Sequence, residues 1–431
     1  MTILEKKISP LEKTLYYLVI FFPIFFFFRS FILNFITIST SLLFLILSIK
    51  IKYNFLNKKY NILLLIFFLY IFLQNLILNK DIEVLIKTIF LFKFFLIFNA
   101  IIFVYSRVDK EFIKKNLIYL FFFILIILLD FLKQYFTGTN FIGLKGSFCN
   151  YTTDQCQRFS GFFGSELIFG GYFSTIIFSS FILFKIFFKN NAINIFAILI
   201  PIIVFLSGER SALLLSLALT IVFYLNIIKF NLKNFFSVLL ILISSIIFIN
   251  FAVKDSTKGR YYSDIKKLII LGQPNFIETL KLTPWGLHYN AGAQMVSEKP
   301  IFGNGFKSFR IKCKNYETKK ISELTRYKVC STHPHNYNLE ILIDTGLLGF
   351  SIFILFVFYL LRDFKINESK KDTLCKVIFY FIVVFIFLPR PTGSIFSTYF
   401  GIIYWYFLGS LLGFSKLLIT DKRMSKTYLN K

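Results

Sequence analysis

Residues 61–79 have the sequence NILLLIFFLYIFLQNLILN, an apolar run without a single charged side chain. An α-helix of about 20 mostly apolar residues is long enough to cross the hydrocarbon core of a bilayer. The run is typical of the chain, because 56% of its 431 residues are hydrophobic and 16% are charged, whereas a typical soluble domain is about 25% charged. This composition excludes a soluble enzyme, a disordered chain and a small disulfide scaffold, and it indicates an integral membrane protein.

Further apolar runs raise the expected number of membrane-spanning helices to about 12, so we predict an all-α integral membrane protein. The first run is short and has no small-residue cleavage site behind it, so we interpret it as a retained span and not as a removable signal. The expected spans cover residues 14–28, 30–49, 61–79, 82–105, 117–136, 161–184, 192–207, 211–228, 235–253, 338–361, 377–389 and 395–415.

Lys and Arg residues are unevenly distributed over the short loops between these spans. The connections 50–60, 106–116, 185–191, 229–234 and 362–376 carry most of them, and the short connections on the other side carry far fewer. Cytoplasmic loops are enriched in Lys and Arg, so these connections are expected in the cytoplasm. Both chain termini are then expected in the cytoplasm as well.

The expected spans divide the chain into five parts. Residues 1–136 form N-terminal transmembrane helices, 137–160 a first periplasmic loop, and 161–253 central transmembrane helices with an arginine turn. Residues 254–337 form one large periplasmic loop before the tenth helix, and 338–431 form the C-terminal transmembrane helices and a cytoplasmic tail.

The chain carries 49 Lys and Arg residues against 22 Asp and Glu residues, which gives a net charge of +27. Nucleic-acid binding would require a soluble basic domain or stripe, and no segment outside the expected spans has that character. We therefore expect membrane lipids around the chain and no nucleic-acid partner.

The cysteines agree with this topology. Cys149 and Cys156 lie in the first outer loop, Cys313 and Cys330 lie in the second, and Cys375 alone lies inside. Even numbers of cysteines on an oxidising face predict two disulfides. Pairing within each loop is the simplest of three connectivities, and four free thiols are the alternative.

The large outer loop contains all three histidines of the chain, His288, His333 and His335. Residues 332–338, THPHNYN, stand before a long apolar run, and Asn336 is expected to cap its helix. His335 is then at the outer membrane surface, where a neutral imidazole accepts a proton from an attacking hydroxyl; a structural histidine is the alternative. Two histidines without a carboxylate trio do not favour a metal site, and we expect no cofactor.

A second polar motif, Ser207-Gly208-Glu209-Arg210-Ser211, interrupts a long apolar stretch on the same expected face. The turn is so short that Arg210 must lie near the bilayer edge. A guanidinium is a planar, permanently charged group suited to phosphate oxygens. An arginine that only extends its charge to the interface is the alternative.

Residues 299–306, KPIFGNGF, form a third candidate motif in the large loop, beside the basic residues Lys307 and Arg310. The Pro, Gly and Asn residues predict a tight ordered turn. Such a turn either presents backbone N–H groups to an anion or is a purely structural turn.

Charged residues fall inside several expected spans, among them Lys93, Asp130 and Glu166. Burying a charge in a bilayer is costly, so we expect Lys93 to pair with one of the two carboxylates beside a polar pocket open to the outside. Arg158 adds a cation at this face, before a helix whose glycines allow close packing.

In chain order, these motifs resemble those of the O-antigen ligase superfamily. His335-Asn336, followed after nine residues by GLLG, is similar to the family's histidine motif, and SGERS to its arginine turn. The PIFGNG stretch resembles its P-x-x-G-x-G segment, and two more stretches resemble its sixth span and the turn before its last span. The matching stretches are 158–171, 207–211, 300–305, 335–349 and 391–394.

The resemblance implies an inverting glycosyltransferase that needs neither a metal nor a nucleotide. Such an enzyme moves a glycan from undecaprenyl diphosphate to a sugar hydroxyl of lipid A–core or another glycan acceptor. It implies a multi-pass protein of the bacterial inner membrane with a periplasmic active site.

The resemblance also suggests roles for individual residues. Arg210 would stabilise the diphosphate leaving group, with Arg158 and an arginine of the large loop, Arg260 or Arg310, as helpers. His335 matches the family's base, although His333 leaves open which imidazole is nearer the acceptor. Two acidic residues one helical turn apart, Glu340 and Asp344, would orient His335 or bind an arginine.

Other functions remain as alternatives. An O-antigen polymerase of the same superfamily joins two lipid-linked units, and other members attach glycans to proteins. A transporter of the lipid-linked glycan is an alternative of another class, favoured only by Lys93 in mid-span. Transporters usually show internal repeats, and we find no convincing repeat between the halves of the sequence.

Overall fold

The computed structural model describes residues 9–28, 30–78, 82–150, 155–188, 194–227, 253–259, 261, 283–316, 330–366 and 372–429. These residues are almost entirely helical, and the strands described are a single antiparallel pair, β1 (Ser147–Asn150) and β2 (Gln155–Arg158). The all-helical membrane class predicted from the sequence agrees with this architecture.

Eight stretches of helix in the described part of the chain are long and apolar enough to cross a membrane. They are α3 (Ser30–Lys50), α4 (Lys59–Leu78), α5 with α6 (Ile82–Ile89, Phe92–Arg107), α7 (Lys110–Thr137), α8 with η3 and α9 (Phe169–Tyr172, Phe173–Ile177, Phe178–Phe188), α11 (Arg210–Ile227), α18 (Tyr337–Ile366) and α20 (Thr398–Leu429).

The other predicted spans differ from these eight. Two are shorter apolar helices, α10 (Asn194–Leu206) and α19 (Thr373–Phe387). The first predicted span is divided into α1 (Pro10–Ile20) and α2 (Phe22–Phe25). The span predicted at 235–253 lies outside the described residues except for Val253. The number 12 therefore stays a prediction.

Helix ends coincide with local sequence signals. α1 begins behind a capping box in which Ser9 and Glu12 bind each other's backbone N–H groups, and α7 ends at Gly138, which has φ of +90°. Asn336 caps α18 as expected, because its side-chain oxygen accepts from the N–H of Leu339 at 3.0 Å. The span predicted at 161–184 begins later, at Phe169, after the short helix η2 (Gly161–Phe163).

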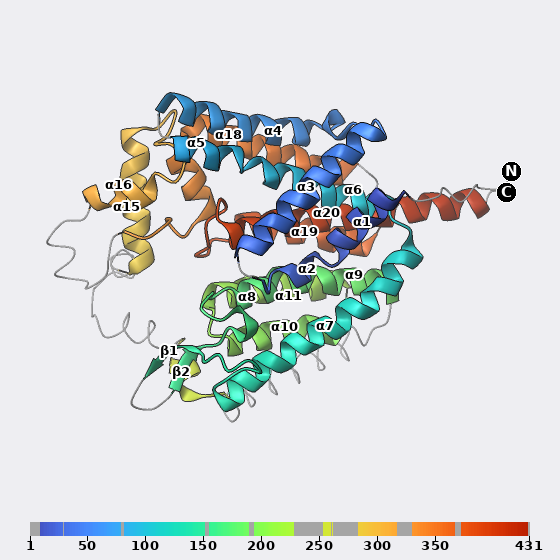
Figure 1. Ribbon diagram of the computed structural model, residues 1–431, viewed down its shortest axis with the longest axis horizontal. Helices are drawn as coiled ribbons and strands as arrows, with labels where there is room; N and C mark the ends of the chain where they lie inside the picture. The colour runs from blue at the N-terminus through green and yellow to red at the C-terminus, as the bar shows by residue number, and fades with distance from the viewer. Residues whose placement is uncertain are drawn as a thin grey trace.

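α20 runs through the middle of the bundle in Figure 1, with α6 beside it. Of its best membrane-spanning window, 83% is buried, against 28% for α7 and for α11. Gly409 and Gly413 let it approach α6 closely, because a Cβ at either position would lie within 3.1 Å of an α6 atom. α20 is therefore the central helix against which the other elements pack.

One end of the bundle carries the helices of the large loop, α15 (Pro284–Glu298) and α16 (Phe309–Lys312), at the left of Figure 1. We call this the loop end. A small separate core of apolar side chains joins these helices to α18, and it includes Leu287, Met295, Phe309 and Ile343. α1 and the end of α20 lie at the opposite end in the same view.

The PIFGNG turn docks onto a kink in α18 at Gly346, whose φ of +65° is left-handed. A Cβ on Gly303 would lie 2.3 Å from the Gly346 nitrogen, so only glycine fits there. The N–H groups of Asn304 and Gly305 donate to the carbonyls of Ile343 and Asp344 at 2.8 and 2.9 Å. These N–H groups are therefore engaged with α18 and not directed at an anion, so this turn, which we call the Gly303–Gly346 junction, is structural.

The prediction that Lys93 pairs with a carboxylate is wrong. Its ammonium donates to the side-chain oxygen of Asn34 on α3. Asp130 accepts hydrogen bonds from the N–H of Phe141 at 2.8 Å and from Asn140 at 3.3 Å. The amide oxygen of Asn34 therefore stabilises Lys93, and hydrogen bonds from residues 140 and 141 stabilise Asp130, so the two charges do not form an ion pair with each other.

Candidate active site

A cavity of about 310 Å³ lies where the start of α11 meets α8, residues 333–335 and the segment between α19 and α20. We call it the arginine cavity. Its charged lining residues are Arg158, Glu209, Arg210 and Arg390, and the imidazoles of His333 and His335 also line it. Three guanidinium groups and one carboxylate leave an excess of two positive charges when the histidines are neutral. Such an arrangement favours a ligand with two or more negative charges.

Arg210 is positioned by the turn between α10 and α11. α10 ends at Leu206, Gly208 adopts a left-handed φ of +75°, and α11 begins at Arg210 itself. The guanidinium lies over the ring of Trp285 on α15, with 5.1 Å from its carbon to the ring centroid. Such cation–π contact holds the charged group flat while leaving its edge able to bind an oxyanion.

Arg158, also in the lining, is held by Glu209, at 3.8 Å, and by the carbonyl of Leu167, at 3.2 Å. The same carboxylate accepts from the N–H of Gly170 at 2.8 Å, so one acidic group ties β2 to the start of α8. Burial lowers the pKa of Arg158, and the charge of Glu209 partly opposes that shift. The Nε atom of Arg158 is buried without a hydrogen-bond partner among the described residues.

Arg390 completes the set, and sequence reasoning missed it as a site residue. It lies between α19 and α20, is 8% exposed, and donates to the Ser211 hydroxyl at 3.4 Å. Burial lowers its pKa, and Tyr337 opposes the shift. Within the described part of the chain, its Nε also has no hydrogen-bond partner. A lone arginine followed by Pro391 at the end of an apolar run gave only a topological signal in the sequence.

The three histidines of the chain come together at this site. The ring centroids of His333 and His335 lie 4.2 Å apart, and those of His288 and His335 lie 5.2 Å apart. His335 has a left-handed φ of +56°, rare for a residue with a side chain, and its carbonyl accepts from the N–H of Thr392 at 2.8 Å. Burial lowers the pKa of His335, so its imidazole is neutral at pH 7.

His333 differs from His335 in how its ring nitrogens are engaged. Its Nε2 lies 3.2 Å from the carbonyl oxygen of Thr392, and its Nδ1 lies 2.9 Å from the hydroxyl of Thr332. A carbonyl only accepts, so Nε2 carries the proton and Nδ1 accepts from the hydroxyl. Burial, with repulsion from His335, lowers the pKa of His333 to about 3, so the ring stays neutral.

The structure corrects the roles expected for the two acidic residues of α18. The Glu340 carboxylate accepts from the Ser394 hydroxyl at 2.5 Å and from the N–H of Ile395 at 3.0 Å. Asp344 accepts from the N–H groups of Lys307 and Ser308 at 2.7 and 3.1 Å. Both carboxylates thus fix neighbouring turns, and among the residues that the structure describes neither is hydrogen-bonded to His335 or paired with an arginine.

The other predicted residues divide into three cases. Arg310 lines a second cavity beside the first, and Arg260 lies outside the described residues. Cys313 and Cys330 form a disulfide, with their Cα atoms 5.4 Å apart. β1 and β2 place the backbones of Cys149 and Cys156 opposite each other, while their side chains lie outside the described part of the structure.

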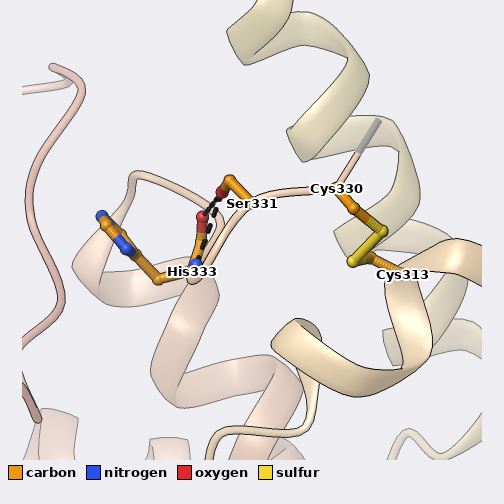
Figure 2. The surroundings of a disulfide bond; sticks show 4 residues. All are labelled: Cys313, Cys330, Ser331 and His333. Atoms are coloured by element: carbon orange, nitrogen blue, oxygen red, sulfur yellow. Dashed lines mark hydrogen bonds between the residues drawn. A yellow bond between two sulfur atoms is a disulfide. The ribbon is translucent and has the colours of Figure 1, made fainter. Parts of the chain in front are cut away.

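Figure 2 shows how the disulfide relates to the histidine segment. Cys330 directly precedes Ser331, whose hydroxyl binds both the N–H and the carbonyl of His333. The bond therefore ties the start of this segment to η5 (Cys313–Tyr316), next to α16. The disulfide therefore restricts the movement of His333 and His335 relative to α18.

The described residues contain no group of three or more His, Cys, Asp or Glu side chains arranged to hold a metal ion. The polar lining of the cavity consists mainly of guanidinium groups and imidazoles, which suit an oxyanion and a proton transfer.

Comparisons with known proteins agree with the motifs found in the sequence. Residues 195–354 match the family model described as O-antigen ligase, which supports membership of the O-antigen ligase-like superfamily. The matched segment contains the arginine turn, the Gly303–Gly346 junction and the histidine segment. A search of curated proteins found no match.

Proposed function

We propose that this chain, whose residues 195–354 match the O-antigen ligase family model, is a metal-independent inverting glycosyltransferase. It would move a glycan from undecaprenyl diphosphate to a sugar hydroxyl of lipid A–core at the periplasmic face of a bacterial inner membrane. The observation that carries the proposal is the arginine cavity, in which three guanidinium groups and a neutral imidazole line one space.

The arginines suit the leaving group of this reaction. When the glycosidic bond breaks, negative charge develops on the diphosphate, and fixed positive charge in a partly buried site lowers the energy of that state. Arg210 supplies the planar group best placed for this, held over Trp285. Arg158 and Arg390 each have a buried Nε without a partner among the described residues, and phosphate oxygens would satisfy both.

The histidines suit activation of the acceptor. A general base needs a neutral imidazole with a free lone pair within reach of the attacking hydroxyl. The lone pair of His333 is already occupied by the Thr332 hydroxyl, which favours His335 as the base. The strained backbone of His335 is consistent with this role, because strain of this kind concentrates at functional sites.

The proposed reaction is a single displacement. The acceptor oxygen attacks the anomeric carbon from the face opposite the diphosphate, and its proton passes to His335. The bond between the anomeric carbon and the phosphate oxygen breaks with its electron pair, so undecaprenyl diphosphate leaves and the configuration inverts. The arginines hold the diphosphate while His335 acts on the other substrate.

The acceptor distinguishes a ligase from a polymerase, and transfer itself distinguishes both from a transporter. The test uses purified protein in detergent with a defined lipid diphosphate-linked donor and either lipid A–core or a second lipid-linked unit. A ligase glycosylates lipid A–core, whereas a polymerase extends the lipid-linked unit. Absence of transfer to either acceptor, from protein shown to be folded, would contradict the glycosyltransferase proposal.

A further inference from the structure

A second cavity, of about 230 Å³, lies beside the arginine cavity. His333 and Phe400 line both, so these two side chains form the wall between the spaces. The second cavity also borders Glu166 and Thr398, which belong to the chain around α8 and to α20. A molecule that occupied it would contact His333, whose ring centroid lies 4.2 Å from that of His335 in the arginine cavity.

The lining of the second cavity is also cationic. Lys307 and Arg310 stand against one carboxylate, Glu166, which leaves an excess of one positive charge. Neither cation forms an ion pair within 4.0 Å in the described part of the chain. Burial and repulsion from Arg310 lower the pKa of Lys307, so an anion between the two would relieve an unfavourable interaction.

Lys307 is held rigidly at this position. Its φ of +56° is left-handed, a conformation that only three non-glycine residues among those described adopt, and His335 is another of them. The buried carboxylate of Asp344 accepts its N–H at 2.7 Å, and the preceding N–H of Phe306 donates to Asn75 at 3.0 Å. Two of the three, Lys307 and His335, thus line adjoining cavities, and the third is Lys52, which lines neither. Strained backbone of this kind is often retained at functional sites.

We propose that the second cavity is the acceptor site and that Lys307 and Arg310 bind an anionic group, a phosphate or a carboxylate, of the acceptor glycan. This inference rests on the proposed transferase activity. The donor diphosphate occupies the arginine cavity, the acceptor enters past Lys307, and its hydroxyl passes the shared wall at His333 to meet the neighbouring His335. The chain then prefers a charged acceptor to a neutral one of the same size.

The test compares two acceptors that differ only in charge, a phosphorylated lipid-linked oligosaccharide and the same molecule after enzymatic removal of its phosphates. The variant is Lys307→Asn with Arg310→Gln, because Asn tolerates a left-handed φ. We expect its KM for the phosphorylated acceptor to rise about tenfold or more, with kcat and the donor KM little changed. For the dephosphorylated acceptor, variant and unaltered protein should have similar KM values.

Matched controls come from the same loop. Lys299→Gln with Lys314→Gln removes two charges from exposed residues that line neither cavity, and it should leave both acceptor KM values unchanged. Arg310→Gln alone, at an exposed position, provides a variant whose folding is not in doubt.

Three results would overturn the proposal. The first is an equal rise in KM for the phosphorylated and the dephosphorylated acceptor. The second is a rise in the donor KM alone, which would assign the cavity to the donor diphosphate or to a lipid headgroup. The third is no change in any KM. Transfer by the unaltered protein is measured in every experiment, so its absence identifies failure of the transferase proposal instead.

Discussion

Two polar regions lie close together at the loop end, and their hydrogen bonding differs. At the Gly303–Gly346 junction, the backbone N–H groups of the turn donate to α18, and the Asp344 carboxylate accepts several hydrogen bonds. In the arginine cavity, the buried Nε atoms of Arg158 and Arg390 lack partners among the described residues. Buried polar groups are costly when unpaired, so the first region holds the shape of the protein and the second is suited to a ligand.

The largest expected effect is on the base. His335→Asn removes the proton acceptor but keeps a residue that tolerates the left-handed φ of +56°. We expect kcat to fall by about 10²–10⁴-fold, the typical contribution of general base catalysis. The measurement is glycan transfer by purified variants matched for monodisperse yield. His333→Asn is the control, and a loss through His333→Asn that exceeds the loss through His335→Asn would reverse the assignment.

The next effect concerns the diphosphate. Arg210→Ala should lower kcat by about 10²–10³-fold, as removal of one group that stabilises a developing charge does. Arg210→Lys should also be poor, because an ammonium does not make the two-pronged contact of a guanidinium. Membrane insertion should be unaffected for both variants. Full activity in Arg210→Lys would show that charge alone is sufficient at this position.

Arg390→Gln should lower kcat/KM for the donor lipid by about tenfold or more, because it removes one buried charged donor to the diphosphate. Arg362→Gln makes the same change at an exposed arginine near the far end of α18 and should have no effect. The readout is kcat/KM for the donor lipid. Equal values for the two variants would remove Arg390 from the site.

The junction should respond through stability and not through chemistry. Gly303→Ala introduces a Cβ 2.3 Å from the Gly346 nitrogen, so we expect less folded protein and a lower unfolding midpoint in detergent. Gly143→Ala has a comparable positive φ but open space around its Cβ, so it should cost only about 1–3 kcal/mol of backbone strain. Correctly folded Gly303→Ala protein with normal stability and abolished turnover would contradict the distinction between the regions.

The smallest effect is the pH profile. The base is active in its neutral form, so kcat rises with pH and levels off above the pKa of His335. Burial lowers that pKa, so the acid limb should lie below the usual value of about 6.5, and activity should be level between pH 7 and 8. An inflection above pH 7 in transfer assays would indicate a different base.

Sequence reasoning identified most of the cavity because its residues lie in compact motifs. Arg210 interrupts an apolar stretch, and Arg158, His333 and His335 lie in outer loops directly before predicted spans, so all four were expected on one face. Cys313 and Cys330 were placed together by loop position alone, and the structure joins them. These inferences needed only the order and orientation of the membrane spans, which the apolar runs and the Lys and Arg residues of the short loops predict.

The remaining features depended on tertiary contacts that no spacing reveals. Arg390 is a single charge beside a proline, and only folding brings it against Ser211. Glu340 and Asp344 lie one turn apart on α18, but the turns that they bind come from distant segments. Lys93 was expected to need a carboxylate, and an amide oxygen on α3 serves instead.

The most direct test of the central claim is a structure determined by electron cryomicroscopy with undecaprenyl diphosphate bound. The account predicts phosphate oxygens in the arginine cavity, about 2.7–2.9 Å from guanidinium nitrogens of Arg210 and of Arg158 or Arg390. A diphosphate bound in the second cavity beside Lys307, or at the opposite end of the bundle, would contradict it.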